Sequence, residues 1–319
     1  MTDLKNNFFF IERAGIHTTF QDNGRQNLNH IGIPVSGVMD KRNYILANSL
    51  LKKEQNSAVL EFAYQGPLLK YTGKKIYVAV TGNVQFQIIK NKGEIINGEA
   101  YRVYLIEDKD QIDIQSTFSS VYGYLAISED FELDKIWNSI STNTKAKIGS
   151  NNGEKLSNDQ KININHNNRD RTLTKLNYMN SKIDYLRVIK ATNFDYFSEK
   201  SKKIFLNEAF TISKLTDRMG MRLEGHNIEN FKNTNIKSEG IVKGVIQVAS
   251  DGNPIIMLAD HGTIGGYPKI ANVISADFDR LAQLVPGTKI RFQEVSLADA
   301  EKLFEIYNLE TNNLVNQII

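Results

Sequence analysis

The sequence has no cysteine among its 319 residues. Disulfide bonds, thiolate nucleophiles and metal sites built on cysteine are therefore excluded. No apolar run approaches the roughly 18 residues that a membrane-spanning helix needs. The apolar stretch at residues 8–11, FFFI, is too short for the core of a signal peptide and is read as a first strand. We therefore expect a soluble, cytoplasmic protein with no membrane partner.

An excess of charge of one sign is also lacking. Lys and Arg number 39 against 36 Asp and Glu, which gives a formal net charge of +3. The basic residues form no long block, so a nucleic-acid partner is not expected. Histidines are too few and scattered to indicate a metal site. The sequence holds five of them: His17, His30, His166, His226 and His261.

Several familiar catalytic motifs are missing as well. The sequence contains no G-x-x-x-x-G-K-[ST] phosphate loop and no G-x-G-x-x-G dinucleotide motif. It contains neither the H-E-x-x-H motif of zinc proteases nor the G-x-S-x-G motif of serine hydrolases. Any phosphate or nucleotide chemistry must therefore use another arrangement or a partner chain.

What is present is chiefly the alternation of β-strands, with Gly or Asn breaks between several of them. Three helices are also predicted: one capped by Asp40, one starting at Ser275 or Asp277, and one over residues 296–309. The fold class is therefore mainly β with a few helices (α+β), as barrel or sandwich lobes rather than a parallel sheet. The predicted strands are residues 75–80, 85–90, 101–106, 121–127, 185–191, 209–215, 244–249, 254–259 and 289–294.

A change of composition divides the chain. Residues 150–181 are dominated by Asn, Lys, Asp and Ser, and residues 163–168, NINHNN, offer little to bury. We predict an N-terminal β-rich lobe over residues 1–150, a polar excursion or linker over 151–183, and a C-terminal lobe over 184–319. An extended surface loop within a single domain is the alternative.

The segment at residues 251–270, DGNPIIMLADHGTIGGYPKI, is the most informative for function. A hydrophobic strand delivers Asp260 and His261 at its end, where catalytic groups are often placed. An adjacent carboxyl and imidazole can move protons near neutral pH. Lys269, presented with Tyr267 after a glycine-rich turn, can hold a carboxylate or phosphate. The alternative is an ordinary hairpin with a capping Asp and a surface His.

Two further clusters are candidates for anion binding. In residues 216–225, TDRMGMRLEG, an extended chain would place Arg218 and Arg222 on one face, where they could clamp an anion. Salt bridges at a rim are the commoner fate of such charges. In residues 32–40, GIPVSGVMD, the helix that follows Asp40 could bind an anion at its N-terminus. Ordinary turn and cap chemistry explains the same residues.

Together these segments resemble the C-subunit family of bacterial ATP-dependent 5-oxoprolinase, also described as allophanate hydrolase subunit 2. That family is similar to half of the carboxyltransferase domain of urea carboxylase. The resemblance runs from about Gly15 to Phe292. It is carried by six segments in order: TFQDNGR at 19–25, GIPVSGVMD at 32–40, SKLTDRMGMRLEG at 213–225, EGIVKGVIQV at 239–248, DHGTIGGYPKI at 260–270 and VISADFDRLAQL at 273–284.

The resemblance implies cyclophilin-like β-barrel lobes and a place in a complex with two partners, an A subunit plus a homologous B subunit. The complex would open the lactam of 5-oxoproline to glutamate with ATP and its Mg²⁺. The substrate is then a small carboxylate or amide. Asp260, His261 and Lys269 are the expected catalytic residues. The expected substrate-binding residues lie in the segments quoted above and are Arg218, Arg222, Tyr267, Ser36, Glu239 and Gln247.

Two alternatives stay open. A biotin-dependent carboxyltransferase acting on urea or a similar amide would need biotin on a partner chain. The other alternative is a non-catalytic binding or regulatory partner of the B subunit. Its best support is that Ile140 stands where the family has Arg. A second departure is that Glu129-Asp130 stands where Gly-Gly is usual.

Overall fold

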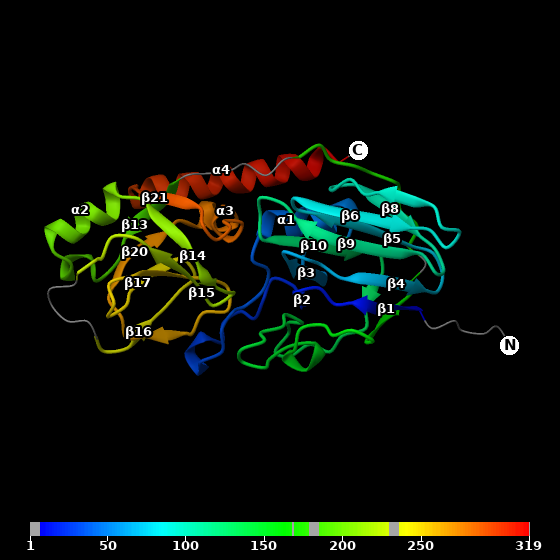
Figure 1. Ribbon diagram of the computed structural model, residues 1–319, viewed down its shortest axis with the longest axis horizontal. Coiled ribbons are helices and arrows are strands. Elements are labelled where there is room, and N and C mark those ends of the chain that lie inside the picture. Colours follow the sequence, from blue (N-terminus) through cyan, green and yellow to red (C-terminus); the bar gives the residue numbers. More distant parts are fainter. Residues whose placement is uncertain (1–6, 168, 179–184, 230–235, 319) are drawn as a thin grey trace. The chain divides into compact units, whose positions relative to one another are not determined.

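The chain folds into two compact units in a computed structural model that describes residues 7–167, 169–178, 185–229 and 236–318 (Figure 1). Unit 1 comprises Met1–Gly24, Asp40–Asn180 and Thr311–Ile319. Unit 2 comprises Arg25–Met39 and Ser181–Glu310. The segment at residues 25–39 thus belongs to the second unit, although both of its neighbours in sequence belong to the first. The predicted boundary between residues 183 and 184 lies outside the described residues.

Unit 1 consists of two antiparallel sheets and a helix. The seven-stranded sheet has the order β11-β12-β1-β4-β9-β6-β7, and the five-stranded sheet has the order β2-β3-β10-β5-β8. The elements are β1 (Asn7–Arg13), β2 (His17–Gln21), α1 (Lys41–Leu50), β3 (Val59–Ala63), β4 (Leu68–Thr72), β5 (Ile76–Thr81), β6 (Val84–Ile89), β7 (Ile95–Asn97), β8 (Val103–Ile106), β9 (Gln111–Thr117), β10 (Tyr122–Ile127), β11 (Asp130–Phe131) and β12 (Lys161–Asn165).

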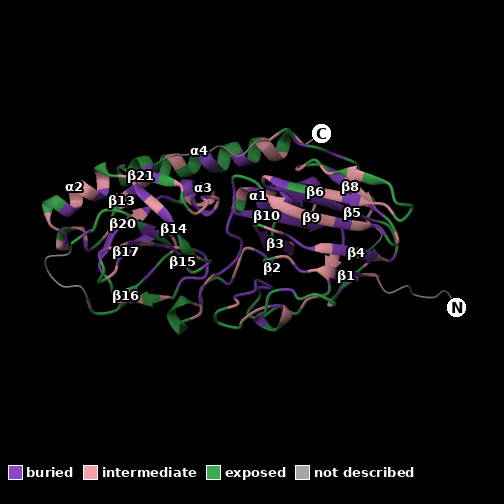
Figure 2. Ribbon diagram, in the orientation of Figure 1, coloured by how far each residue is buried: buried purple, intermediate pink, exposed green. Residues whose placement is uncertain are grey.

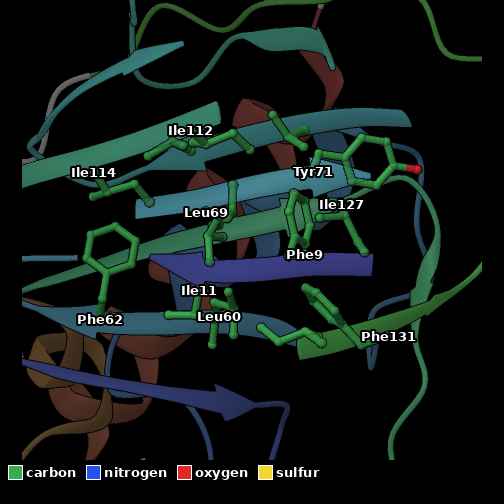
Figure 3. Close-up of a cluster of buried hydrophobic side chains, with 14 of the residues drawn as sticks. Phe9, Ile11, Leu60, Phe62, Leu69, Tyr71, Ile112, Ile114, Ile127 and Phe131 are labelled. Carbon is green, nitrogen blue, oxygen red and sulfur yellow. The ribbon is translucent and has the colours of Figure 1, made fainter. Parts of the chain in front are cut away.

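The core of unit 1 is formed by side chains from both of its sheets (Figure 3). Phe9 and Ile11 of β1 are fully buried and alternate with partly exposed neighbours, as one face of a half-buried strand requires. Leu60 and Phe62 of β3 belong to the same cluster from the other sheet. Burying one side chain of this size stabilises a fold by roughly 1.5–3 kcal/mol, so the apolar alternation in the sequence is the main source of this unit's stability.

Helix α1 begins as predicted after Asp40. The Asp40 carboxylate accepts a hydrogen bond from the backbone N–H of Asn43 at 2.9 Å, which caps the helix. Tyr44 and Leu46 of α1 are buried. The Asp40 carboxylate therefore occupies the N-terminus of α1 itself. This supports the capping explanation of Asp40 over the anion site.

The predicted polar excursion contains a strand. Ile162 and Ile164 of β12 are buried and alternate with exposed Lys161 and Asn163. Strand β12 pairs with β1 through Phe9↔Ile162 and with the two-residue strand β11. Two isoleucines are enough to anchor this Asn-rich segment, because the strand period places both on one face.

Both departures from the family pattern have structural roles in unit 1. The Ile140 side chain belongs to the hydrophobic core, and its backbone N–H donates to Asp22 Oδ2 at 2.9 Å. The buried Glu129 carboxylate accepts hydrogen bonds from the backbone N–H groups of Asn167 and Arg169. Glu129 therefore fixes the segment that follows β12, and Ile140 contributes apolar packing.

Unit 2 contains a closed barrel with the order β13-β20-β17-β18-β15-β14-β21. Strands β13 and β21 pair in parallel, and the other neighbours are antiparallel. The mainly β fold class is therefore confirmed. The elements are β13 (Tyr185–Lys190), α2 (Glu199–Asn207), β14 (Phe210–Thr216), β15 (Gly220–Glu224), β16 (Glu239–Gly240), β17 (Val245–Val248), β18 (Pro254–Met257), β19 (Ile264–Gly265), β20 (Lys269–Val273), α3 (Phe278–Ala282), β21 (Lys289–Glu294) and α4 (Leu297–Asn316), of which the residues from Thr311 onward belong to unit 1.

Alternation along the strands fills the barrel with apolar side chains. Met221 and Leu223 of β15 are buried, whereas Arg222 between them is exposed. Helix α2 contributes Phe205, whose ring stacks on that of Phe292 of β21 with centroids 4.4 Å apart. Aromatic pairs of this kind add about 0.5–1.5 kcal/mol to the burial of their area.

Helix α4 confirms the prediction of a helix after Ser296 but continues to Asn316. The Ser296 hydroxyl accepts from the backbone N–H of Asp299 at 3.1 Å, a standard N-cap. Figure 2 shows that exposed residues are frequent along α4, whereas the strands are largely buried or intermediate. Among the described residues, no helix combines the length and apolar character required to cross a membrane.

Candidate functional site

The candidate site in unit 2 is built around the C-terminal end of strand β18. The strand leads into Asp260 and His261, each of which is only 4% exposed. The loop at residues 25–39 meets this point, because the Ser36 N–H donates to the Ala259 carbonyl at 3.2 Å. Ser36 has a φ of 58°, a left-handed conformation that costs a non-glycine residue free energy. The strand end and the loop thus place Ser36 beside Asp260.

Asp260 forms a buried ion pair with Arg218. The guanidinium Nε lies 2.8 Å from Oδ2 and Nη2 lies 3.1 Å from Oδ1, which is the bidentate geometry that arginine favours. The Arg218 Nη2 also donates to the Gly37 carbonyl at 2.6 Å. Since the guanidinium engages both carboxylate oxygens, the Asp260 side chain is held in one orientation and anchors the site.

The turn between β14 and β15 directs Arg218 toward Asp260. Asp217 Oδ1 accepts hydrogen bonds from the N–H groups of Met219 at 2.8 Å and Gly220 at 3.3 Å, a local turn typical of Asp. Residues 217–219 are therefore not extended. The prediction that Arg218 and Arg222 share one face is wrong for this reason: Arg218 is buried, whereas Arg222 is exposed on β15.

His261 is the group in this site best suited to proton transfer. Burial lowers the pKa of His261 below its ordinary value, partly opposed by the Gly262 carbonyl and by Asp260, while nearby Lys243 lowers it further. Its Nδ1 lies 2.6 Å from the Gly262 carbonyl, which can only accept, so Nδ1 carries the proton in the neutral ring. The Nε2 lone pair is then the basic position.

A second group of predicted residues lies on strands β17 and β20. Gln247 and Lys269 are directly paired in the β17–β20 register, so their side chains share one face. The Lys269 ammonium lies 2.5 Å from Glu239 Oε2 and 3.3 Å from the Gly240 carbonyl. Gln247 Nε2 donates to the Tyr267 carbonyl at 3.1 Å. Predicted residues from the segments at 239–248 and 260–270 are therefore brought together, namely Glu239, Gln247, Tyr267 and Lys269.

The predicted site residues fall into two groups in unit 2, with Arg222 outside both. One contains Ser36, Arg218, Asp260 and His261, and the other contains Glu239, Gln247, Tyr267 and Lys269. The pKa of the Asp251 carboxyl is lowered mainly by hydrogen bonds from Asn253, and the charge of Arg222 lowers it further.

Lys243 was missed by the sequence reasoning. Its ammonium donates to the Met39 carbonyl at 3.3 Å and lies 5.1 Å from the centroid of the Phe278 ring. It belongs to the resembling segment at 239–248, but a single lysine next to a glycine carries no pattern that would single it out.

We expect the stability of unit 2 to depend on pH through His261. Since its pKa is lower in the folded protein, the unfolded chain binds more protons as pH falls below about 6.5. This contribution to stability is complete above that value and is lost on acidification toward the folded pKa. Chemical denaturation between about pH 7.5 and 5 should therefore show a steeper loss for the wild type than for His261→Gln. Equal slopes would show that His261 titrates normally.

Comparison with known proteins identifies a family and similar proteins. Residues 31–294 match a family model described as the carboxyltransferase domain, subdomain A and B. The chain is 32% identical over 302 residues to the 5-oxoprolinase C subunit of Haemophilus influenzae, covering 94% of this chain and 96% of that protein. It is 28% identical over 298 residues to the Escherichia coli protein of the same name, covering 92% and 93%.

A crystal structure of K. lactis urea amidolyase has the same fold, with a TM-score of 0.87 at 23% identity. The match covers 99% of this chain and 21% of that protein, so the present chain corresponds to about a fifth of the larger one.

Proposed function

The chain belongs to the carboxyltransferase domain A and B family, and on this premise we propose that it is the C subunit of an ATP-dependent 5-oxoprolinase complex. The observation that carries the proposal is the similarity to the 5-oxoprolinase C subunit of Haemophilus influenzae. The match covers 94% of this chain and 96% of that protein. The proposal includes two cytoplasmic partners, a homologous B subunit plus an A subunit.

The site chemistry supports a small carboxylate as substrate. ATP would phosphorylate the lactam oxygen and leave as ADP. One water would then add to the activated ring carbon and expel the ring nitrogen, which leaves an acyl phosphate, and a second water would release phosphate and give glutamate. Lys269 supplies a buried ammonium for the substrate carboxylate or the developing negative charge. His261 offers Nε2 to accept a proton from the attacking water. The Arg218–Asp260 pair positions the strand end from which His261 emerges.

The triphosphate of ATP fits this chain poorly. Of the two buried cations of the candidate site, Arg218 is held by both oxygens of Asp260. Lys269 alone carries too little positive charge to balance a triphosphate. The sequence has no glycine-rich phosphate loop. We therefore assign the main ATP and Mg²⁺ contacts to a partner protein of the complex.

It follows that the purified chain alone should hydrolyse ATP negligibly, with or without 5-oxoproline. The physical reason is that a transition state with several negative charges needs preorganised cations and backbone N–H groups. A phosphate-release assay on the isolated chain measures this. Robust turnover that 5-oxoproline stimulates would contradict the division of labour within the complex.

The function itself is tested by co-purifying the chain with the products of its neighbouring genes. Glutamate formed from 5-oxoproline in the presence and absence of ATP is then measured by chromatography. ATP-dependent glutamate formation supports the proposal. A stable complex that forms no glutamate from 5-oxoproline would refute it.

A biotin-dependent carboxyltransferase is the second candidate, because the matching family model is that of a carboxyltransferase domain and the fold is shared with urea amidolyase. This function needs a biotin-bearing partner. Streptavidin capture of a biotinylated protein together with this chain, and loss of activity with avidin, would favour it. A complex that contains no biotin and still opens 5-oxoproline would exclude it.

A further inference from the structure

Lys269 and Glu239 form an asymmetric ion pair. The Lys269 side chain is 8% exposed, whereas the Glu239 side chain is 42% exposed. Glu239 can leave the pair and enter water at little cost in desolvation, but the ammonium cannot follow it. A buried charge without a counter-ion is strongly destabilising. If Glu239 leaves, the position it vacates therefore requires another anion.

Another pair in the chain has the same asymmetry but is locked. Lys53 is 2% exposed and its partner Asp130 is 43% exposed, with 2.5 Å between Nζ and Oδ1. Asp130 also binds Arg169 at 3.0 Å and accepts from Asn167 at 3.1 Å, so several donors hold its carboxylate. Among the described residues, Lys269 is the one hydrogen-bonding or ionic partner of the Glu239 side chain. Glu239 is therefore held much less firmly than Asp130.

Glu239 is also carried by a small element. Strands β16 and β19 form a separate two-stranded sheet with only two register pairs, Glu239↔Gly265 and Gly240↔Ile264. Ile264 is 66% exposed, and a Cβ on Gly240 would meet no atom within 4 Å. The ladder is short and has exposed positions on both strands, although the backbone N–H of Ile241 also donates to the Thr263 carbonyl at 3.0 Å. A short ladder of this kind opens locally at a lower free energy than the closed barrel does.

The β16–β19 sheet lies directly against the paired face of β17 and β20. A Cβ built on Gly265 would lie 2.8 Å from Gln247 Nε2, closer than real side chains approach. The sheet thus covers Gln247 and, through Glu239, Lys269. Moving it would expose both side chains together.

We propose that Glu239 is a displaceable internal stand-in for the substrate carboxylate, so that an incoming carboxylate takes its place on Lys269 and the two-stranded β16–β19 sheet opens. The inference rests on the proposed function for the identity of the substrate. Exchange of one carboxylate for another leaves the charge of the buried site unchanged. A substrate that bound beside Glu239 would instead leave two carboxylates on one ammonium, a like-charge arrangement that costs free energy.

The test is calorimetric titration of the full-length chain with 5-oxoproline, with acetate as a simple carboxylate and with 2-pyrrolidinone as the lactam without a carboxylate. Glu239→Gln removes the competing charge but keeps the side-chain shape. It should bind 5-oxoproline about tenfold more tightly than the wild type, because a closed β16–β19 sheet that is about 90% populated weakens apparent affinity by that factor. Asp130→Asn, the matched change in the locked pair, should leave the affinity unchanged. Lys269→Met should abolish binding.

The outcomes separate this inference from the proposed function. Tighter binding of acetate but not of 5-oxoproline by Glu239→Gln would support the stand-in and contradict the proposed substrate. Unchanged or weaker binding of both carboxylates, acetate and 5-oxoproline, by Glu239→Gln would overturn the stand-in while the substrate proposal survives. Absence of carboxylate binding by all variants, or equal binding of 2-pyrrolidinone, would also overturn the stand-in.

Discussion

Arg218→Met is expected to lower the free energy of unfolding of unit 2 by about 3–5 kcal/mol. The substitution removes a guanidinium that binds both oxygens of Asp260, whose side chain is 2% exposed. A carboxylate left alone at that depth keeps its desolvation penalty and loses the attraction that offset it. The Gly37 carbonyl loses its bond from Nη2 as well.

The measurement must report on unit 2. The single tryptophan, Trp137, lies in unit 1, so its fluorescence is unsuitable. Amide hydrogen exchange of β15 and β18 as a function of denaturant reports the correct unit.

The double variant Arg218→Met/Asp260→Leu is the control. It should recover much of the loss, because apolar residues of similar volume often replace a buried ion pair without penalty. A cost below about 1 kcal/mol for the single variant would show that the pair is solvated and not a structural anchor.

Lys269→Met is expected to reduce turnover of the assembled complex by about 10²-fold, while the chain still folds and assembles. The ammonium is the buried cation proposed to meet the substrate carboxylate or the developing charge, and methionine keeps the length of its aliphatic stem. Glu239 loses its partner but is 42% exposed and can turn to water. The backbone N–H of Lys269 keeps its bond to Asn193 Oδ1 at 3.1 Å.

Lys214→Met, which changes an exposed lysine on β14 of the same unit, is the matched control. It removes the same charge from the chain and should leave turnover unchanged. Steady-state kinetics of glutamate formation by each complex, with size-exclusion chromatography for assembly, provide the measurement. Normal turnover by an assembled Lys269→Met complex would show that the ion pair with Glu239 is permanent and structural.

The sequence predicted local features well where one residue type has one physical role. Asp40 caps α1 because a carboxylate before an apolar periodic run has few other uses. Strand alternation located β5, β6, β10, β13 and β21 to within about two residues. The strand that ends before Asp260 and His261 was also anticipated.

What the sequence did not predict depends on the fold as a whole. No local pattern shows that residues 25–39 belong to unit 2, where Ser36 lies beside Ala259. Burial of Arg218 and exposure of Arg222 follow from the Asp217 turn, which interrupts the assumed extended chain. The pairing of Lys269 with Glu239 spans 30 residues and is fixed by the barrel register. Long-range register is not written in any single segment.

The proposal that this chain is a required subunit of a 5-oxoprolinase is tested most directly by leaving the chain out of a complex reconstituted with its A and B partners. With all three proteins, 5-oxoproline should stimulate ATP hydrolysis and glutamate should accumulate. Without this chain, both should fall to background and return when the wild-type chain is added back, but only weakly with Lys269→Met. Full ring opening by the A and B partners alone would contradict the account.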